Sequence, residues 1–187
     1  MVKKKTCVFI SGRGTNLKNL ISNSRSNNFP IKISLVICNN KKAYGINYAK
    51  KYRIPYIFIN TKLQNYENKI LYNLKKYQIN FICLAGFMKI ISNKLIRNFQ
   101  KKIINIHPSL LPKFKGLDTF SRILKNKEIK TGCTVHYVNQ KLDGGNTIMQ
   151  KSFFIKNEDN ENTLKQKTQR LEYKAFPEAI IKIFRNS

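Results

Sequence analysis

The chain has 187 residues, which fits one domain with a core of its own and is too short for two ordinary domains. Hydrophobic residues make up 42% of it, and no apolar run approaches the roughly 18 residues of a membrane span, so we expect a soluble protein. The formal net charge of +27 is typical of nucleic-acid-binding proteins. The lysines are spread along the whole chain beside many Asn and Ile residues, however, which indicates a compositional bias.

The cysteines are scattered and form no C-x-x-C pair; they are Cys7, Cys38, Cys83 and Cys133. Because structural zinc needs clustered ligands, we expect no metal site and four reduced core thiols in a cytoplasmic protein. Basic residues at the N-terminus precede an apolar stretch that is too short for a secretion signal. Export is therefore not expected.

Apolar runs of strand length recur in the first half of the chain, separated by helix-length polar segments. These runs are Thr6–Ile10, Ile31–Ile37, Tyr56–Ile59, Phe81–Ala85 and Ile103–Ile106. Buried strands that alternate with amphipathic helices predict a parallel sheet covered on both faces. The sequence therefore predicts an α/β protein with a Rossmann-like, doubly wound, mostly parallel sheet.

The pattern of apolar runs and connections changes after Pro112. Val135–Val138 and Ile148–Ile155 have strand composition, but their connection is too short for a parallel crossover, so we expect an antiparallel extension at the sheet edge. Residues 162–184 have helical periodicity and predict a C-terminal helix. Pro177 should kink or interrupt that helix, because proline removes a helical hydrogen bond.

A glycine-rich segment from Ser11 to Leu17 follows the first expected strand and opens a helix, a context in which backbone N–H groups bind phosphate. A dinucleotide site is disfavoured, because Leu17 replaces the third glycine and no Asp or Glu precedes Glu67. One interpretation is a terminal-phosphate site, with donors from Thr15 and Asn16. The other is a tight turn in which Thr15 or Asn16 is the helix N-cap.

The sequence holds two histidines, His107 and His136, so candidates for acid–base chemistry near neutral pH are few. His107 follows an expected parallel strand at its carboxyl end, where ligands bind in such sheets. Asn105 lies two residues earlier, so both side chains should project from the same face. A structural role for the pair is the alternative, and His136 is expected to be structural or to face the substrate.

Asp143 is one of nine carboxylates and is followed by two glycines, a pattern that indicates a turn. A carboxylate on that turn, brought toward His107, would raise the pKa of the imidazole and fix its orientation. A turn without chemistry is the alternative.

Four motifs, in this order and spacing, resemble a known family: ISGRGTNL at residues 10–17, LAGFM at 84–88, NIHPSLLP at 105–112 and LDGG at 142–145. The chain resembles the folate-dependent formyltransferases over essentially its whole length, and in particular the phosphoribosylglycinamide formyltransferases. The resemblance implies formyl transfer from 10-formyltetrahydrofolate to the amine of N1-(5-phospho-D-ribosyl)glycinamide (glycinamide ribonucleotide) in purine biosynthesis. The reaction that the resemblance implies requires no metal. We expect one domain over residues 1–187, with a phosphate-binding half at about 1–100 and a catalytic and folate-binding half at about 101–187.

The resemblance also implies the site residues. The catalytic residues would be Asn105, His107 and Asp143, with Asn105 and protonated His107 donating to a tetrahedral oxyanion and Asp143 keeping the imidazole cationic. The substrate's phosphate would be bound by Gly14, Thr15, Asn16, Leu17 and Lys18, and its other groups by Gln169, Arg170, Leu171 and Glu172. The folate would be bound by Met88, Lys89, Ile90, Ile91, Asn105, Asn139, Gln140, Lys141, Leu142 and Asp143.

Three positions depart from the family pattern: Leu63 stands where many relatives have arginine, and Asp118 and Phe120 stand where many have histidine. These departures concern peripheral contacts with ligands. The expected partners are small molecules, with no membrane or nucleic acid, and the chain is expected to be a monomer or homodimer.

Three other functions compete with this interpretation. A formyltetrahydrofolate deformylase, with water as acceptor, normally has an extra N-terminal regulatory domain, whereas this sequence starts at the first strand. A methionyl-tRNA formyltransferase usually has a further C-terminal domain. A basic nucleic-acid-binding module would agree with the charge, but the sequence has neither a helix-turn-helix pattern nor aromatic–basic repeats.

Overall fold

The structure is a computed structural model that describes residues 2–185. Its strands have the hydrogen-bonded order β3-β2-β1-β4-β5-β6-β7. The elements are β1 (Lys4–Ile10), α1 (Thr15–Ser24), β2 (Ile31–Cys38), α2 (Gly45–Lys51), β3 (Tyr56–Phe58), α3 (Tyr66–Lys76), β4 (Phe81–Leu84), α4 (Asn93–Phe99), β5 (Ile103–His107), α5 (Thr119–Lys125), β6 (Lys130–Tyr137), β7 (Thr147–Phe154) and α6 (Glu161–Phe184). The chain divides into two compact units, one ending at Ile104 and one beginning at Asn105. A single domain over the whole chain stays a prediction.

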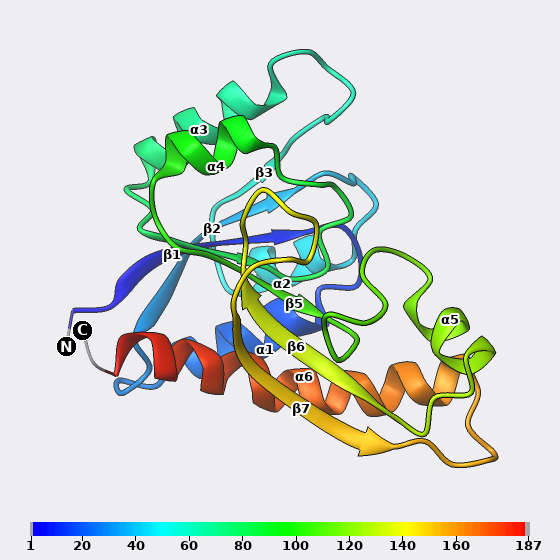
Figure 1. Cartoon of the computed structure of the whole chain (residues 1–187). Helices are drawn as coiled ribbons and strands as arrows, with labels where there is room; N and C mark the ends of the chain where they lie inside the picture. Colours follow the sequence, from blue (N-terminus) through cyan, green and yellow to red (C-terminus); the bar gives the residue numbers. More distant parts are fainter. Residues whose placement is uncertain (1, 186–187) are drawn as a thin grey trace. The chain divides into compact units, whose positions relative to one another are not determined.

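The first unit contains the parallel strands that the apolar runs predict. β1 pairs with β2 on one side and with β4 on the other, and β2 pairs with β3. β1 is fully buried from Thr6 to Ile10, because its side chains face packed layers on both sides of the sheet. Helix α1 packs on β2 and beside α2, and α3 lies beside α4 (Figure 1).

The second unit contains the antiparallel extension. β6 and β7 pair antiparallel, from Lys130 opposite Phe154 to His136 opposite Thr147, with an irregularity between Val135 and His136. Helix α6 packs along both strands (Figure 1). The prediction of an antiparallel edge with a C-terminal helix is therefore confirmed.

Helix α6 runs unbroken through Pro177, so of the two predicted effects, a kink or an interruption, the interruption does not occur. An interior proline costs a helix about 3 kcal/mol. The neighbouring side chains of Ala175, Phe176, Ala179 and Ile180 are completely buried. Burying one large apolar side chain contributes about 1.5–3 kcal/mol, so packing on the strands offsets the cost of the proline.

The start of α6 is fixed by a capping box. The Asn160 side chain accepts from the backbone N–H of Thr163 at 3.1 Å, and Thr163 Oγ1 accepts from the Asn160 backbone at 2.9 Å. Next to it, Asp159 accepts from the Lys156 backbone and from Lys167 Nζ. These two hydrogen bonds, in that order of importance, lower the pKa of Asp159 to about 2.

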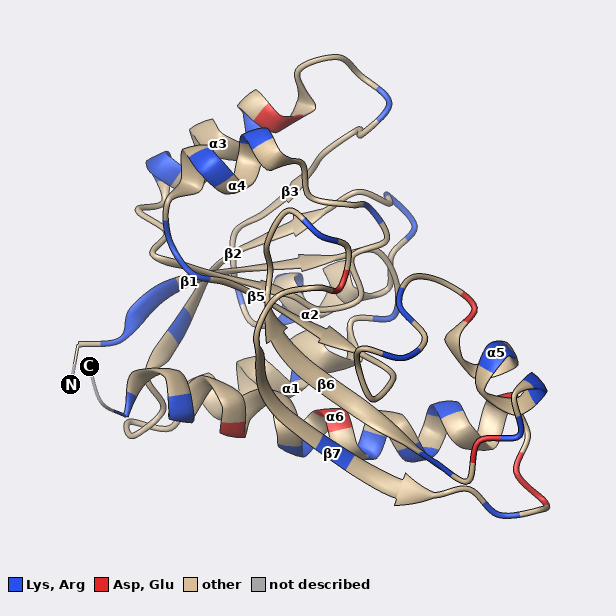
Figure 2. Cartoon of the chain, viewed as in Figure 1, with Lys and Arg blue, Asp and Glu red and all other residues tan. Residues whose placement is uncertain are grey.

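All four cysteines are buried and free, which confirms the predicted core thiols. Lys and Arg lie on helices, strands and loops of both units (Figure 2). Within residues 2–185, no helix is long and apolar enough to cross a membrane.

Asn160→Ala should lower the free energy of unfolding by about 1 kcal/mol, because two N–H groups at the start of α6 lose their acceptor. Chemical denaturation of the two proteins measures the difference. Asn162→Ala, two residues further along and exposed, is the matched control and should change stability by less than about 0.5 kcal/mol. Equal losses in the two variants would contradict a specific capping role.

Candidate active site

Asn105 and His107 leave β5 on the same face, as their two-residue spacing predicts, and both reach Asp143. Asn105 Nδ2 lies 3.4 Å from Asp143 Oδ1, and His107 Nδ1 lies 3.4 Å from Asp143 Oδ2. The side chains of His107 and Asp143 are 7% and 9% exposed. The structure thus brings the three predicted catalytic residues together in a nearly closed cluster within the second unit.

The imidazole of His107 has a polar neighbour at each ring nitrogen. Nε2 lies 2.8 Å from the carbonyl oxygen of Phe114, and because a carbonyl only accepts, Nε2 carries a hydrogen. The neutral ring then presents a lone pair at Nδ1 to the Asp143 carboxylate, whereas the imidazolium presents a second N–H. Protonation of His107 therefore completes the hydrogen bonding of the pair.

The pKa of His107 is nevertheless below its usual value. Burial is the main cause, because it disfavours the charged ring. The Phe114 carbonyl and the Asp143 carboxylate raise the pKa, while His136 and Arg122 lower it further. Asp143 acts in the expected direction, but the prediction that the imidazole has a raised pKa is wrong, because desolvation outweighs the carboxylate.

Asp143 stays ionised in these surroundings. Burial raises its pKa, but the contact with His136, the hydrogen bond from the Gly116 backbone and the charge of the nearby histidines together lower it below the usual value. Gly116 N donates to Asp143 Oδ2 at 2.9 Å. The Asp143 backbone has a left-handed φ of 44°, in keeping with the turn that its following glycines indicate.

His136 belongs to the same cluster, although the sequence predicts only a structural or substrate-facing role for it. Its Nδ1 donates to the Tyr137 carbonyl at 2.8 Å, so Nε2 of the neutral ring is an acceptor. Asn105 Nδ2 lies 3.2 Å from that Nε2, and Asp143 Oδ1 lies 3.6 Å from it. Both amide hydrogens of Asn105 are thus directed at His136 and Asp143.

One sequence signal could have located His136. Thr134 and His136 are two residues apart on β6 and therefore share a face. Thr134 Oγ1 donates to the Ser109 carbonyl at 2.7 Å and accepts from Leu111 N at 3.0 Å, so this face of β6 meets the segment that follows β5. The chain turns there, with a cis peptide bond between Leu111 and Pro112.

The glycine segment of the first unit leads directly into α1. Gly14 is the N-cap of α1, with a left-handed φ of 71°, and the helix starts at Thr15. The interpretation in which Thr15 or Asn16 is the N-cap is therefore wrong. A Cβ atom on Gly14 would collide with the Cα atom of Gly45, so both space and backbone conformation require glycine.

Ser11 ties this glycine segment to the chain after β4. Its hydroxyl donates to Asn39 Oδ1 at 2.6 Å and accepts from the backbone N–H of Met88 at 2.7 Å. Its own N–H donates to the Gly86 carbonyl at 3.1 Å. A substitution at Ser11 would therefore act on two segments for which the sequence predicts ligand binding.

The remaining predicted residues lie on three segments. Met88, Lys89, Ile90 and Ile91 form an irregular stretch before α4, in which Met88 and Ile90 are 66% and 67% exposed. The turn between β6 and β7 carries Asn139, Gln140, Lys141 and Leu142, all exposed. The middle of α6 carries Gln169, Arg170, Leu171 and Glu172.

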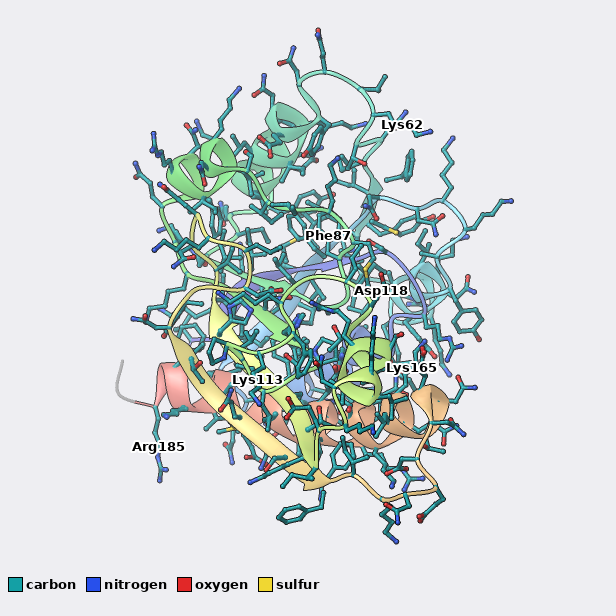
Figure 3. The ribbon with its side chains drawn as sticks, turned by 45° about the vertical axis from the view of Figure 1, so that its right-hand side comes forward. Lys62, Phe87, Lys113, Asp118, Lys165 and Arg185 are labelled. Atoms are coloured by element: carbon teal, nitrogen blue, oxygen red, sulfur yellow. The ribbon has the colours of Figure 1, made fainter. Side chains whose placement is uncertain are left out.

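The three departing positions lie outside the Asp143 cluster as its hydrogen bonds define it. Leu63 is exposed between β3 and α3, whereas Asp118 is the N-cap of α5 and Phe120 lies in its first turn. Asp118 lies at the start of α5, and Lys113 lies in the middle of the segment between β5 and α5 (Figure 3). Among residues 2–185, no group of three or more His, Cys, Asp or Glu side chains is placed to hold a metal ion.

Comparison with known proteins gives the family. A family model described as formyl transferase matches residues 4–180. The chain is 40% identical over 185 residues to the phosphoribosylglycinamide formyltransferase of Haemophilus influenzae, which covers 97% of this chain and 87% of that protein. The chain belongs to the phosphoribosylglycinamide formyltransferase family. The trifunctional purine biosynthetic protein adenosine-3 of Homo sapiens is 38% identical over 184 residues, which cover 95% of this chain and 18% of that protein.

Solved structures of this formyltransferase family have the same fold. The phosphoribosylglycinamide formyltransferase of Anaplasma phagocytophilum matches with a TM-score of 0.92 at 37% identity, covering 99% of this chain and 89% of that one. That of Campylobacter jejuni matches with a TM-score of 0.90 at 34% identity, covering 98% of each chain. The predicted α/β fold is thus confirmed, and the chain is an enzyme of formyl transfer.

Gly14→Ala should lower the free energy of unfolding of this formyltransferase by at least about 2 kcal/mol. A left-handed alanine alone costs about 1–2 kcal/mol, and the new Cβ also meets the Gly45 backbone. Urea denaturation measures the loss. Gly12→Ala is the matched control, because a Cβ there meets nothing within 4 Å, and it should stay within about 0.5 kcal/mol of the parent. A Gly14→Ala variant as stable as Gly12→Ala would show that the loop has room to rearrange.

Proposed function

We propose that this chain transfers the formyl group of 10-formyltetrahydrofolate to the amine of glycinamide ribonucleotide, with Asn105, His107 and Asp143 performing the chemistry. The observation that carries these roles is the buried cluster in which one ionised carboxylate holds both an imidazole and an amide at the end of β5. Formyl transfer needs a donor for a developing oxyanion and a proton for the departing nitrogen. His107 can meet both needs from one ring.

The phosphate of glycinamide ribonucleotide binds at Gly14, Thr15, Asn16, Leu17 and Lys18 in this proposal. Support comes from the position of these residues at the N-terminus of α1, where backbone dipoles favour an anion, and from the left-handed Gly14 that opens the helix. Gln169, Arg170, Leu171 and Glu172 bind other groups of the same substrate. A strongly positive chain also raises the local concentration of an anionic substrate.

The folate binds at Met88 to Ile91, together with Asn105 and the turn Asn139 to Asp143. The support on the first segment is chemical, because Met88 and Ile90 expose large apolar side chains that an aromatic ring system would cover. Ile91 is buried and Ser92 caps α4, so the segment is anchored at its far end. Backbone groups of such an irregular stretch can serve as donors and acceptors for the polar edge of the ring.

The oxyanion is stabilised by His107 Nε2–H. In the free enzyme that hydrogen is directed at the Phe114 carbonyl, so the formyl oxygen has to compete with a backbone acceptor. The competition favours the transition state, because a hydrogen bond to an ion is roughly twice as strong as one to a neutral carbonyl. The donor thus discriminates between the neutral formyl group and the tetrahedral oxyanion.

The departing folate nitrogen receives its proton from the imidazolium form of His107. Burial lowers the pKa of this group, which makes the imidazolium a stronger acid and leaves less of it protonated at neutral pH. Asp143 partly restores the protonated fraction by accepting from Nδ1–H. The proton released by the attacking amine passes to water or to the His107–Asp143 pair.

Asn105 has two available roles, which depend on the orientation of its amide. With Nδ2 directed at His136 and Asp143, Oδ1 is the atom that can face a ligand and accept from the attacking amine. The predicted role as an oxyanion donor requires the amide to turn over. Oδ1 would then face His136 Nε2 and the Asp143 carboxylate, which is favourable only with a proton on Nε2.

The wider setting follows the same expectations. We infer a cytoplasmic enzyme that acts on small molecules as a monomer or homodimer, without a metal or a nucleic-acid partner. The four buried thiols agree with a reducing compartment.

One assay tests the function against its competitors. Purified protein is given 10-formyltetrahydrofolate with glycinamide ribonucleotide, with formylatable methionyl-tRNA or with water alone, and release of tetrahydrofolate is followed by absorbance. Turnover that requires glycinamide ribonucleotide supports the proposal. Turnover with water alone indicates a deformylase, and turnover with the tRNA indicates the other formyltransferase. No turnover, together with duplex DNA binding that survives about 0.2 M salt, indicates a nucleic-acid-binding module.

His107→Ala should lower kcat by at least about 10²-fold, because it removes both the oxyanion donor and the proton donor. Asp143→Asn should also lower kcat. It should shift the apparent pKa of the group that must be protonated downward, since Asp143 raises the pKa of His107. Steady-state kinetics between pH 5 and pH 9 measure both effects.

The double variant tests whether the two residues act as one unit. Because Asp143 acts largely through His107, the losses in kcat should not multiply. Fully multiplicative losses, or near-parent turnover in His107→Ala, would contradict the pairing and favour His136 as the working imidazole.

A further inference from the structure

The backbone of residues 114–116, the clamp loop, binds both members of the His107–Asp143 pair. The Phe114 carbonyl accepts from His107 Nε2 at 2.8 Å, and the Gly116 N–H donates to Asp143 Oδ2 at 2.9 Å. One carbonyl and one N–H, two residues apart, therefore orient the ring and the carboxylate. The geometry of the pair depends on where this short stretch of backbone lies.

The clamp loop has an unfavourable backbone conformation. Phe114 and Gly116 have φ values of 57° and 77°, and Asp118, just beyond them, has a φ of 53°. A left-handed conformation costs a residue with a Cβ roughly 1–2 kcal/mol. Such a loop keeps its shape only if other contacts hold it.

Arg122 supplies two of these contacts from α5. Its Nη2 donates to the Lys115 carbonyl at 2.5 Å, and its guanidinium lies 5.9 Å from the centre of the Phe114 ring. Its Nε is buried and has no hydrogen-bond partner among the described residues. The side chain therefore makes its polar contact with the protein through Nη2.

We propose that Arg122 is a positioning residue of the reaction: by holding the clamp loop at Lys115 and Phe114, it fixes His107 and Asp143 relative to each other. The link to turnover rests on the proposed role of His107, whereas the link to the geometry of the pair does not. A lysine would not replace it, because a single ammonium lacks the planar fork that bonds a carbonyl while lying over a ring.

Charge gives this role a separate signature. The charged and titratable groups that face His107 are Asp143 from the β6–β7 turn, His136 from β6 and Arg122 from α5. Arg122 lowers the pKa of His107 by repelling the imidazolium. Removing the guanidinium charge alone would raise the pKa of His107, whereas loosening the Phe114 and Asp143 contacts would lower it, so a variant that keeps the charge isolates the positioning effect.

The experiment compares Arg122→Gln, Arg122→Lys and the control Lys125→Gln, which removes an exposed charge from the same helix. Because the chain has only two histidines, NMR of the labelled imidazoles resolves the titration of each one in the free enzyme. In Arg122→Gln and in Arg122→Lys, the Nε2–H of His107 should exchange faster with solvent, because the clamp loop is loosened. Arg122→Lys keeps the charge but loosens contacts that raise the pKa of His107, so His107 should titrate at lower pH in that variant. Lys125→Gln should match the parent in every respect.

Kinetics provide the second readout. Arg122→Gln and Arg122→Lys should each lower kcat between about 10-fold and 10²-fold, because small displacements of reacting groups cost that much. The KM of both variants for glycinamide ribonucleotide should stay within about 2-fold of the parent value. Unchanged kcat and parent exchange of the His107 Nε2–H in a folded Arg122→Gln variant would overturn the proposal.

Two further outcomes are distinguishable. If Arg122→Gln does not fold, Phe114→Leu replaces it as the test variant, because it removes the ring under the guanidinium and keeps the carbonyl. Phe114→Leu should also speed exchange of the His107 Nε2–H. Exchange at the parent rate in that variant would overturn the proposal. If the parent protein does not transfer formyl groups, the proposed function fails. The NMR comparison in the free enzyme still decides whether Arg122 holds the pair.

Discussion

The active-site cluster depends on one buried carboxylate. Asp143 lies within 3.6 Å of His107, His136 and Asn105, and it also accepts from the Gly116 backbone. Isolated ionised carboxylates are very costly to bury, so these neighbours are what keep Asp143 charged at 9% exposure. The reverse also holds, because the side chains around it take their orientation from the negative charge that they enclose.

Enclosure has a chemical consequence for His107. The same exclusion of water that strengthens its contact with Asp143 also penalises the imidazolium, and the penalty is the larger effect. A fully solvated His–Asp pair would hold its proton more tightly and would be a weaker acid. Burial therefore makes the His107 imidazolium a stronger acid than it would be in water.

Sequence reasoning located the strands, the antiparallel edge and three members of the cluster, because each has a local signature. Apolar runs mark β1 and β4, the two-residue spacing aligns Asn105 with His107, and two glycines mark the turn at Asp143. It gave His136 only a structural or substrate-facing role and did not single out Arg122, because the contacts of both join elements distant in the sequence. It did not anticipate that helix α6 continues through Pro177, because packing outweighs a local preference. Nor did it anticipate the net lowering of the pKa of His107, because burial cannot be read from a motif.

The orientation of Asn105 links the two histidines. Its Nδ2 lies 3.2 Å from His136 Nε2 and 3.4 Å from Asp143 Oδ1, so one amide group contacts both the ring and the carboxylate. If the Asn105 amide turned over to present Nδ2 to an oxyanion, its Oδ1 would lie beside the negatively charged oxygen of Asp143. A proton on His136 Nε2 removes that repulsion by donating to Oδ1 or to the carboxylate. Which end of the Asn105 amide can face away from the carboxylate is therefore coupled to the proton on His136 Nε2.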